Sequence, residues 1–253
     1  MNLLGEVVAW FTTVGNWTGA GGVPVRMLEH LYYSGLALLV GLLVAVPVGV
    51  LVGHTGRGSF LVVGIANGMR ALPELGLLIL LVVLMGIGLV PVVLALTVLA
   101  VPPLLAGTYA GVRNVDRAVV DAARGMGMRE SQVLFKVELP NALPLVLGGA
   151  RSAALQVIAT AAVAAYVSYG GLGRYLIDGQ RQQDYAQMVA GAFLIAVLAL
   201  LVEAALTLLQ SAVVSPGLRD GTRRSPTVDV TRADADAPTA QRSPAPELAG
   251  VER

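Results

Sequence analysis

Long apolar runs separated by short polar turns make up most of this chain. The first run, Leu31 to Gly53, is long enough to cross a hydrocarbon core of roughly 30 Å as a helix that rises about 1.5 Å per residue. Similar runs cover residues 59–88, 91–112, 141–167 and about 187–214. The pattern therefore predicts an all-α, polytopic bundle of membrane-spanning helices.

The second run contains several residues that interrupt a helix or carry charge, namely Asn67, Gly68, Arg70, Pro73 and Glu74. Residues 59–88 are either one long kinked helix, which gives about five spans, or two shorter passes, which give six. Arg70 and Glu74 are four residues apart, a spacing that puts both on one helix face. Charges inside a membrane usually face a bundle interior or water. Arg70, Pro73 and Glu74 therefore either line a solute path or gate, or form an internal pair that fixes the kink.

The loops differ in positive charge, which predicts their side of the membrane. Residues 113–140 hold Arg113, Arg117, Arg124, Arg129 and Lys136, whereas residues 168–186 hold only Arg174 and Arg181, offset by Asp178 and Asp184. We therefore expect 113–140 in the cytoplasm and 168–186 outside. A single crossing by 59–88 also leaves Arg57 in the cytoplasm and the amino terminus outside, and it fits the charge rule better than two crossings do.

The two ends of the chain differ from its apolar middle. Residues 1–30 are expected outside the cell, either as a short helix lying in the membrane interface or as a loosely ordered terminus. Residues 31–214 would form the transmembrane domain. Residues 215–253 are rich in Pro, Ala, Asp, Arg and Thr, which predicts a disordered cytoplasmic tail.

Composition supports a membrane protein. Of the 253 residues, 56% are hydrophobic and 13% are charged, with a mean hydropathy of +0.75. Soluble domains carry about a quarter charged residues. The net charge of +1 does not point to nucleic acid, and we expect the lipid bilayer rather than nucleic acid as a partner.

The chain shows no recognisable catalytic or metal site. It has no Cys, and its two histidines, His30 and His54, stand at opposite ends of the first span. The only lysine, Lys136, lacks the glycine frame of a P-loop, so ATP is not expected to bind by that route. No Ser/His/Asp cluster or paired-carboxylate site is recognisable. The sequence therefore indicates neither an enzyme nor a cofactor.

The stretch "DAARGMGMRESQVLFKVELP", residues 121–140, is one of the few charged segments. It predicts a cytoplasmic helix, a turn at Gly125 and Gly127, and a second short helix that Pro140 stops. Asn114 or Asp116 would cap the first helix. One side of the first helix would carry Val119, Val120, Ala122, Ala123 and Met126, and one face of the second would carry Val133, Leu134 and Val137. Exposed small residues would let a partner protein approach closely.

This stretch resembles the EAA signature of the membrane subunits of ATP-binding-cassette (ABC) importers. The signature is Glu-Ala-Ala, three residues, Gly, nine residues, Ile, one residue and Leu-Pro. Here it is filled by Asp121, Ala122, Ala123, Gly127, Val137, Leu139 and Pro140, with Asp for Glu and Val for Ile. The resemblance implies a type I ABC-importer permease whose loop 113–140 docks a cytoplasmic ATPase. The alternative is a surface hairpin without a partner.

Other segments resemble the osmoprotectant branch of this family, and the likeness covers roughly residues 31–212. They are "GMRALPELGLLILLVVLMGIGLVP", "YAGVRNVDRAVVDAARGMGM" and "SYGGLGRYLIDG". In the last, Ser168 and Tyr169 replace a Gly and an Ala of the branch. The resemblance implies that Tyr169, Gly170, Gly171 and Gly173 lie on the external side, near the gate and the receptor.

In that family, two permease subunits form the pathway, two cytoplasmic ATPases dock on them, and an external solute-binding receptor delivers the solute. The resemblance implies glycine betaine, choline or carnitine as cargo. The alternatives are another small solute, such as an amino acid, or an ion-coupled secondary transporter. The latter would normally show inverted repeats, and none is apparent. Tyr166, Tyr169, Tyr175 and Tyr185 would form an aromatic belt or guide a quaternary ammonium by cation–π attraction.

Overall fold

The computed structural model describes residues 2–214, and within this range every regular element is helical. The all-α prediction is thus confirmed. The elements are α1 (Leu3–Thr12), η1 (Val14–Asn16), α2 (Val23–Thr55), α3 (Ser59–Arg70), α4 (Glu74–Met85), α5 (Leu89–Arg113), α6 (Arg117–Gly125), α7 (Glu130–Val133), the π-helical turn η2 (Leu134–Glu138), α8 (Leu139–Thr160), η3 (Ala161–Val167), α9 (Gly173–Gln182) and α10 (Tyr185–Val213). The predicted disordered tail, 215–253, lies outside the described residues.

The spans agree with the five-span prediction. Four segments of the described chain are long and apolar enough to cross a membrane, namely α2, α5, the run from α7 through η3 (Glu130–Val167) and α10. Helices α3 and α4 pass the same test only as a pair, and they are bent by 86° at the break between them. Counted as one broken span, this pair brings the total to five.

The first span begins earlier than its apolar run suggests, at Val23 rather than at Leu31. Gly22 precedes it in an extended conformation, and Pro24 occupies the first turn, where a missing N–H costs nothing. The polar residues that seemed to lie outside the span are helical because they have partners. Arg26 donates to Glu29 at 2.9 Å, and His30 Nε2 lies 3.0 Å from the Ile158 carbonyl oxygen.

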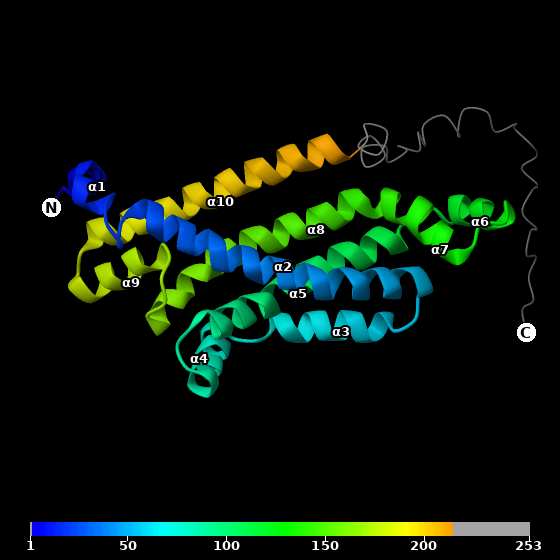
Figure 1. The fold of residues 1–253 in the computed structure, drawn as a ribbon, viewed down its shortest axis with the longest axis horizontal. Helices are drawn as coiled ribbons and strands as arrows, with labels where there is room; N and C mark the ends of the chain where they lie inside the picture. The colour runs from blue at the N-terminus through cyan, green and yellow to red at the C-terminus, as the bar shows by residue number, and fades with distance from the viewer. Residues whose placement is uncertain (1, 215–253) are drawn as a thin grey trace, which may run out of the picture.

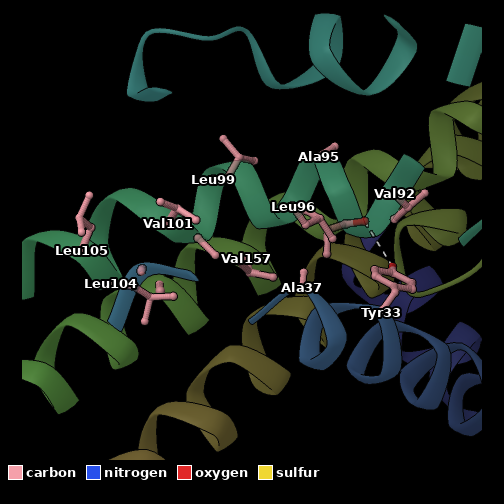
Figure 2. Packing of buried hydrophobic residues seen from close by; sticks show 14 of the residues in the cluster. Tyr33, Ala37, Val92, Ala95, Leu96, Leu99, Val101, Leu104, Leu105 and Val157 are labelled. Atoms are coloured by element: carbon pink, nitrogen blue, oxygen red, sulfur yellow. Dashed lines mark hydrogen bonds between the residues drawn. The ribbon is translucent and has the colours of Figure 1, made fainter. Parts of the chain in front are cut away.

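Helices α2, α5 and α8 form the centre of the bundle because small residues let their backbones approach. A Cβ added to Gly49 of α2 would lie 2.8 Å from the Thr108 Cβ of α5. Between α5 and α8, a Cβ on Gly107 would lie 2.7 Å from the Gly149 Cα. Figure 2 shows the apolar side chains that fill the remaining space, with Ala37 of α2 and Val157 of α8 facing the α5 row.

The bundle has two distinct ends, which we call the α1–α9 end and the α6–α7 end (Figure 1). Helix α10 begins at the first and packs along α8, where Arg151 Nε lies 2.9 Å from Glu203 Oε1. Of the two alternatives for the amino terminus, the short helix is present, as α1. Its Trp10 is buried against Tyr175, with ring centroids 5.2 Å apart. This tryptophan therefore packs against other residues of the protein.

Candidate functional site

The insert at the α6–α7 end forms the helix, turn and helix that the sequence predicts. Asp116 begins α6, and its Oδ1 accepts a hydrogen bond from the Ala118 N–H at 2.9 Å. After α6, Gly127 adopts φ +82°, a left-handed conformation that glycine adopts without steric cost. The Met128 N–H then donates back to the Ala123 carbonyl oxygen at 3.2 Å. These contacts close a Schellman-type turn, which holds the two helices together.

A small apolar cluster supports the insert from inside. Its buried members are Val120, Ala123 and Val133, with Val115, Met128 and Val137 packed around them. The predicted apolar side of the first helix is divided, because Val120 and Ala123 are buried whereas Val119, Ala122 and Met126 are exposed. Helix α6 is too short for its whole apolar side to find cover, and only the residues that meet α7 are buried.

Pro140 does not stop the second helix, contrary to the prediction. The chain stays helical from Glu130 through η2 into α8, with Pro140 in the first turn of α8. A proline there has no N–H to donate to the preceding turn. The π-helical turn lies immediately before it, where the regular ladder is already interrupted. The second helix of the insert and the following span thus form one continuous helical segment.

The outer surface of the insert combines exposed small, acidic and apolar groups. Of the seven signature residues, Asp121, Ala122, Gly127 and Pro140 are exposed, Val137 and Leu139 are half-buried, and Ala123 is buried. No atom lies within 4 Å of the place where a Cβ on Gly127 would stand. Beside these residues, Met126 is 77% exposed and Phe135 is 65% exposed. Large apolar side chains exposed beside polar and charged groups are typical of a protein-binding surface.

Phe135 was not identified from the sequence as a site residue. Its neighbours Leu134 and Val137 were expected to share an apolar face, and that pattern gave no reason to single out Phe135. Its position in the sequence could have identified Phe135 as a site residue. It is a bulky apolar residue among charged neighbours, off the face that Val133 and Val137 define.

Ion pairs fix the exposed side of the insert. Arg124 donates to both carboxylate oxygens of Glu130, at 2.9 and 3.0 Å. Its Nη1 also lies 3.6 Å from Asp121 Oδ1. The hydrogen bond with Glu130 raises the pKa of the Arg124 guanidinium, so this side chain stays charged. At the start of α7, the backbone N–H of the N-cap residue Arg129 donates to Gln132 Oε1 at 2.9 Å, so the Gln132 side chain satisfies this N–H.

A second feature missed from the sequence joins the insert to the end of α2. His54 Nδ1 lies 2.5 Å from Glu138 Oε2, and His54 Nε2 lies 3.4 Å from Glu130 Oε2. Glu138 is only 5% exposed although it carries a carboxylate. This contact was not predictable from the sequence, because the two hydrogen-bonded residues are 84 positions apart in the chain. Within residues 2–214, no group of three His, Cys, Asp or Glu side chains is arranged to hold a metal ion.

Arg70, Pro73 and Glu74 lie at the break of the bent span. The prediction that Arg70 and Glu74 share one helix face is wrong, because Arg70 ends α3 and Glu74 begins α4. Among the described residues, no ion pair is formed between them. Each charge instead complements a helix dipole. The cation Arg70 lies at the carboxyl end of α3, and the anion Glu74 lies at the amino end of α4. Glu74 also borders a small hollow with Leu78, Leu96 and Thr160.

The glycine-rich segment at the α1–α9 end forms a tight turn against α2. The Gly171 N–H donates to Glu29 Oε2 at 2.8 Å, and Gly171 has φ +89°. A Cβ on Gly170, Gly171 or Gly173 would collide with Glu29, Tyr33 or the Ala162 backbone, respectively. Gly171 and Gly173 are buried, while Tyr169 and Gly170 are half-buried. These glycines therefore fix the packing of this end.

The four tyrosines near this end do not form one belt. Tyr166 and Tyr185 are exposed, but Tyr175 is buried and its hydroxyl donates to the Gly21 carbonyl oxygen at 2.7 Å. Burial also raises the pKa of the Tyr175 phenol, which therefore stays protonated as a donor. Tyr169 packs edge-on against Tyr33, with centroids 5.8 Å apart. The belt interpretation is thus wrong for Tyr175.

Among curated proteins, several transport permeases are similar to this chain, at 31–34% sequence identity. The chain is 34% identical over 196 residues to the carnitine transport permease protein OpuCB of Listeria monocytogenes, covering 78% of this chain and 90% of that one. It is 31% identical to the choline transport system permease protein OpuBB of Bacillus subtilis, with 80% and 93% covered. It is 32% identical to the osmoprotectant import permease protein OsmW of Salmonella typhimurium, with 79% and 95% covered.

Solved structures of ABC transporters share this arrangement of helices. A chain of the inward-facing MetNI methionine ABC transporter aligns with a TM-score of 0.68 at 26% identity, covering 76% of this chain and 97% of that one. An amino acid ABC transporter with histidines aligns with a TM-score of 0.58 at 18% identity, covering 84% and 97%, which shows the fold alone. The family described as binding-protein-dependent transport system inner membrane component matches residues 37–219. The chain belongs to this family and is a multi-pass inner membrane permease subunit of an ABC importer.

Proposed function

We propose that this chain is the permease for a small quaternary amine osmoprotectant such as glycine betaine, choline or carnitine. The support comes from the relatives, because permeases named for carnitine, choline or osmoprotectants match about four-fifths of the chain at similar identity. Hydrolysis of ATP then belongs to a separate subunit, and this chain provides the membrane pathway.

The ATPase docks on the exposed side of the insert. Asp121, Ala122 and Gly127 form the centre of this surface, and Met126 and Phe135 are its apolar anchors. Ala and Gly leave room for a partner backbone, while exposed apolar side chains supply area to bury. The surface is supported from beneath by the half-buried Val137 and Leu139 and the buried Ala123. Pro140 connects this surface to the span that must move.

The α6–α7 end faces the cytoplasm and the α1–α9 end faces outward. Positive charge supports this orientation, since Arg113, Arg117, Arg124 and Arg129 all belong to the α6–α7 end. The amino terminus is then external, and an external solute-binding receptor approaches the α1–α9 end. There the turn from Tyr169 to Gly173 borders the gate, and residues 1–30 contribute an outer segment through α1.

A second permease subunit completes the pathway. In the described part of the chain, α3, α4 and α10 expose large apolar side chains, including Phe60, Val83 and Leu200. Lipid or a second permease covers such surfaces. The break at Arg70, Pro73 and Glu74 belongs to the solute path, because unpaired charges at a discontinuous helix are tolerated only next to water or protein.

The observation that carries this proposal is the exposed docking surface on a chain whose relatives are osmoprotectant permeases. The test is uptake of radiolabelled solutes by a transport-deficient host at high osmolarity, with the whole importer expressed. We expect uptake of glycine betaine, choline or carnitine, and restored growth with the solute that is taken up. Uptake of an amino acid such as methionine or histidine instead would overturn the substrate assignment and leave the permease role intact.

A further inference from the structure

His54 is the polar link between α2 and the insert. It lies in the last turn of α2, and its side chain is 14% exposed. Its two ring nitrogens face Glu138 and Glu130, both of which belong to the insert. Among residues 2–214, the ion pairs and side-chain hydrogen bonds between α2 and the insert all pass through His54.

Carboxylates beside both ring nitrogens favour the charged form of the imidazole. An ionised carboxylate only accepts hydrogen bonds, and a neutral imidazole has a single N–H. A neutral ring would point a lone pair at one of the two carboxylates. The imidazolium instead places an N–H on each side, at 2.5 Å from Glu138 Oε2 and 3.4 Å from Glu130 Oε2. The buried Glu138 carboxylate also requires a charged partner, because an unpaired buried charge is costly.

Further charges surround this group from α5 and α6. His54 and Glu138 border a polar hollow together with Arg113, Arg117, Asp121 and Arg124. Arg113 lies beside Gly56, where an added Cβ would stand 3.3 Å from its Nη1. Arg124 is already held by Glu130 and Asp121. The result is a chain of alternating charge that starts at the exposed Asp121 and runs through Arg124, Glu130 and His54 to Glu138.

We propose that protonated His54 is a positioning residue that transmits movement of the insert to α2 during transport. This inference rests on the proposed function, in which an ATPase docks on the insert. Helix α2 packs along α5 through Gly49 and Gly53, so a pull on its last turn reaches the centre of the bundle. Without the link, the ATPase still docks and hydrolyses ATP, but fewer solute molecules cross per ATP.

The test measures solute molecules taken up per ATP hydrolysed by the complete importer in proteoliposomes. His54→Gln keeps one hydrogen bond and loses the charge, whereas His54→Arg keeps the charge and fits beside the hollow. We expect His54→Gln to lower the ratio severalfold while the ATPase still co-purifies, and His54→Arg to restore most of it. A His54→Gln ratio equal to that of the unchanged chain would overturn the inference.

Rescue by a charged side chain gives a readout that a purely structural role would not move. Glutamine replaces the imidazole without a charge, whereas arginine is larger and keeps the charge. A ratio for His54→Arg no higher than that for His54→Gln would contradict the proposal. Loss of ATPase co-purification from the unchanged chain would instead reject the docking function itself.

Discussion

Gly107 of α5 and Gly149 of α8 approach so closely that a Cβ added to Gly107 would stand 2.7 Å from the Gly149 Cα. Neither backbone can move without disturbing the centre of the bundle. We therefore expect Gly149→Ala to destabilise the protein by about 1–3 kcal/mol through overpacking. Thermal unfolding of the detergent-solubilised protein measures this loss.

The neighbouring Gly148 is the matched control. It belongs to the same helix, and no atom lies within 4 Å of the position of its Cβ. Gly148→Ala should leave the unfolding temperature unchanged or slightly raised, since alanine favours helix. Equal unfolding temperatures for the two variants would show that the α5–α8 contact is looser than described.

The docking surface predicts a local effect of charge at Phe135. Phe135→Asp places a carboxylate at an apolar anchor of the docking surface, and the side chain is exposed enough that folding should not suffer. Co-purification with the ATPase should fall by at least about tenfold. Val14→Asp makes the same change at a 73% exposed apolar position of the opposite end and should have no effect on the ATPase. If both variants retain the ATPase equally, the docking surface lies elsewhere.

The turn at Gly127 predicts a strain effect that does not depend on steric contact. Its φ of +82° costs a residue with a Cβ about 1–2 kcal/mol, while the space around it is open. Gly127→Ala should therefore loosen the insert and weaken ATPase co-purification. Gly125→Ala, in the last turn of α6 with open space around it, should leave binding unchanged or tighter. Identical binding by the two variants would argue against the turn as a determinant of docking.

The break in the second span predicts that a cation is needed at Arg70. Arg70 ends α3, and with no acidic partner in the described residues its charge is available to the helix carboxyl end and to the pathway. Arg70→Leu should abolish uptake while the ATPase still co-purifies, and Arg70→Lys should keep most of the uptake. Normal uptake by Arg70→Leu would exclude this residue from the pathway.

The fold was predictable from the sequence because membrane spans leave long apolar runs, and the bent second span was indicated by Arg70, Pro73 and Glu74. Local capping was predictable too, since Asp116 and Gly127 act through neighbours in the chain. The start of α2 was not, because Arg26 and His30 look like loop residues until their partners are known.

The other features that were not predicted from the sequence depend on contacts between segments far apart in the chain. The pairing of His54 with Glu138, the burial of Trp10 against Tyr175 and the exposure of Phe135 all depend on tertiary packing. Pro140 shows a different limit. Proline usually ends a helix, but in a first turn that follows a π-helical turn it lets the helix continue. Local pattern alone cannot distinguish these two cases.

The central claim is that this chain provides the membrane pathway of an osmoprotectant importer driven by a separate ATPase. The most direct measurement is uptake of radiolabelled glycine betaine, choline and carnitine into proteoliposomes that contain the chain. Uptake of at least one of them should require the ATPase, ATP and the solute receptor together. Uptake that proceeds without the ATPase, or is driven by an ion gradient alone, would contradict the account.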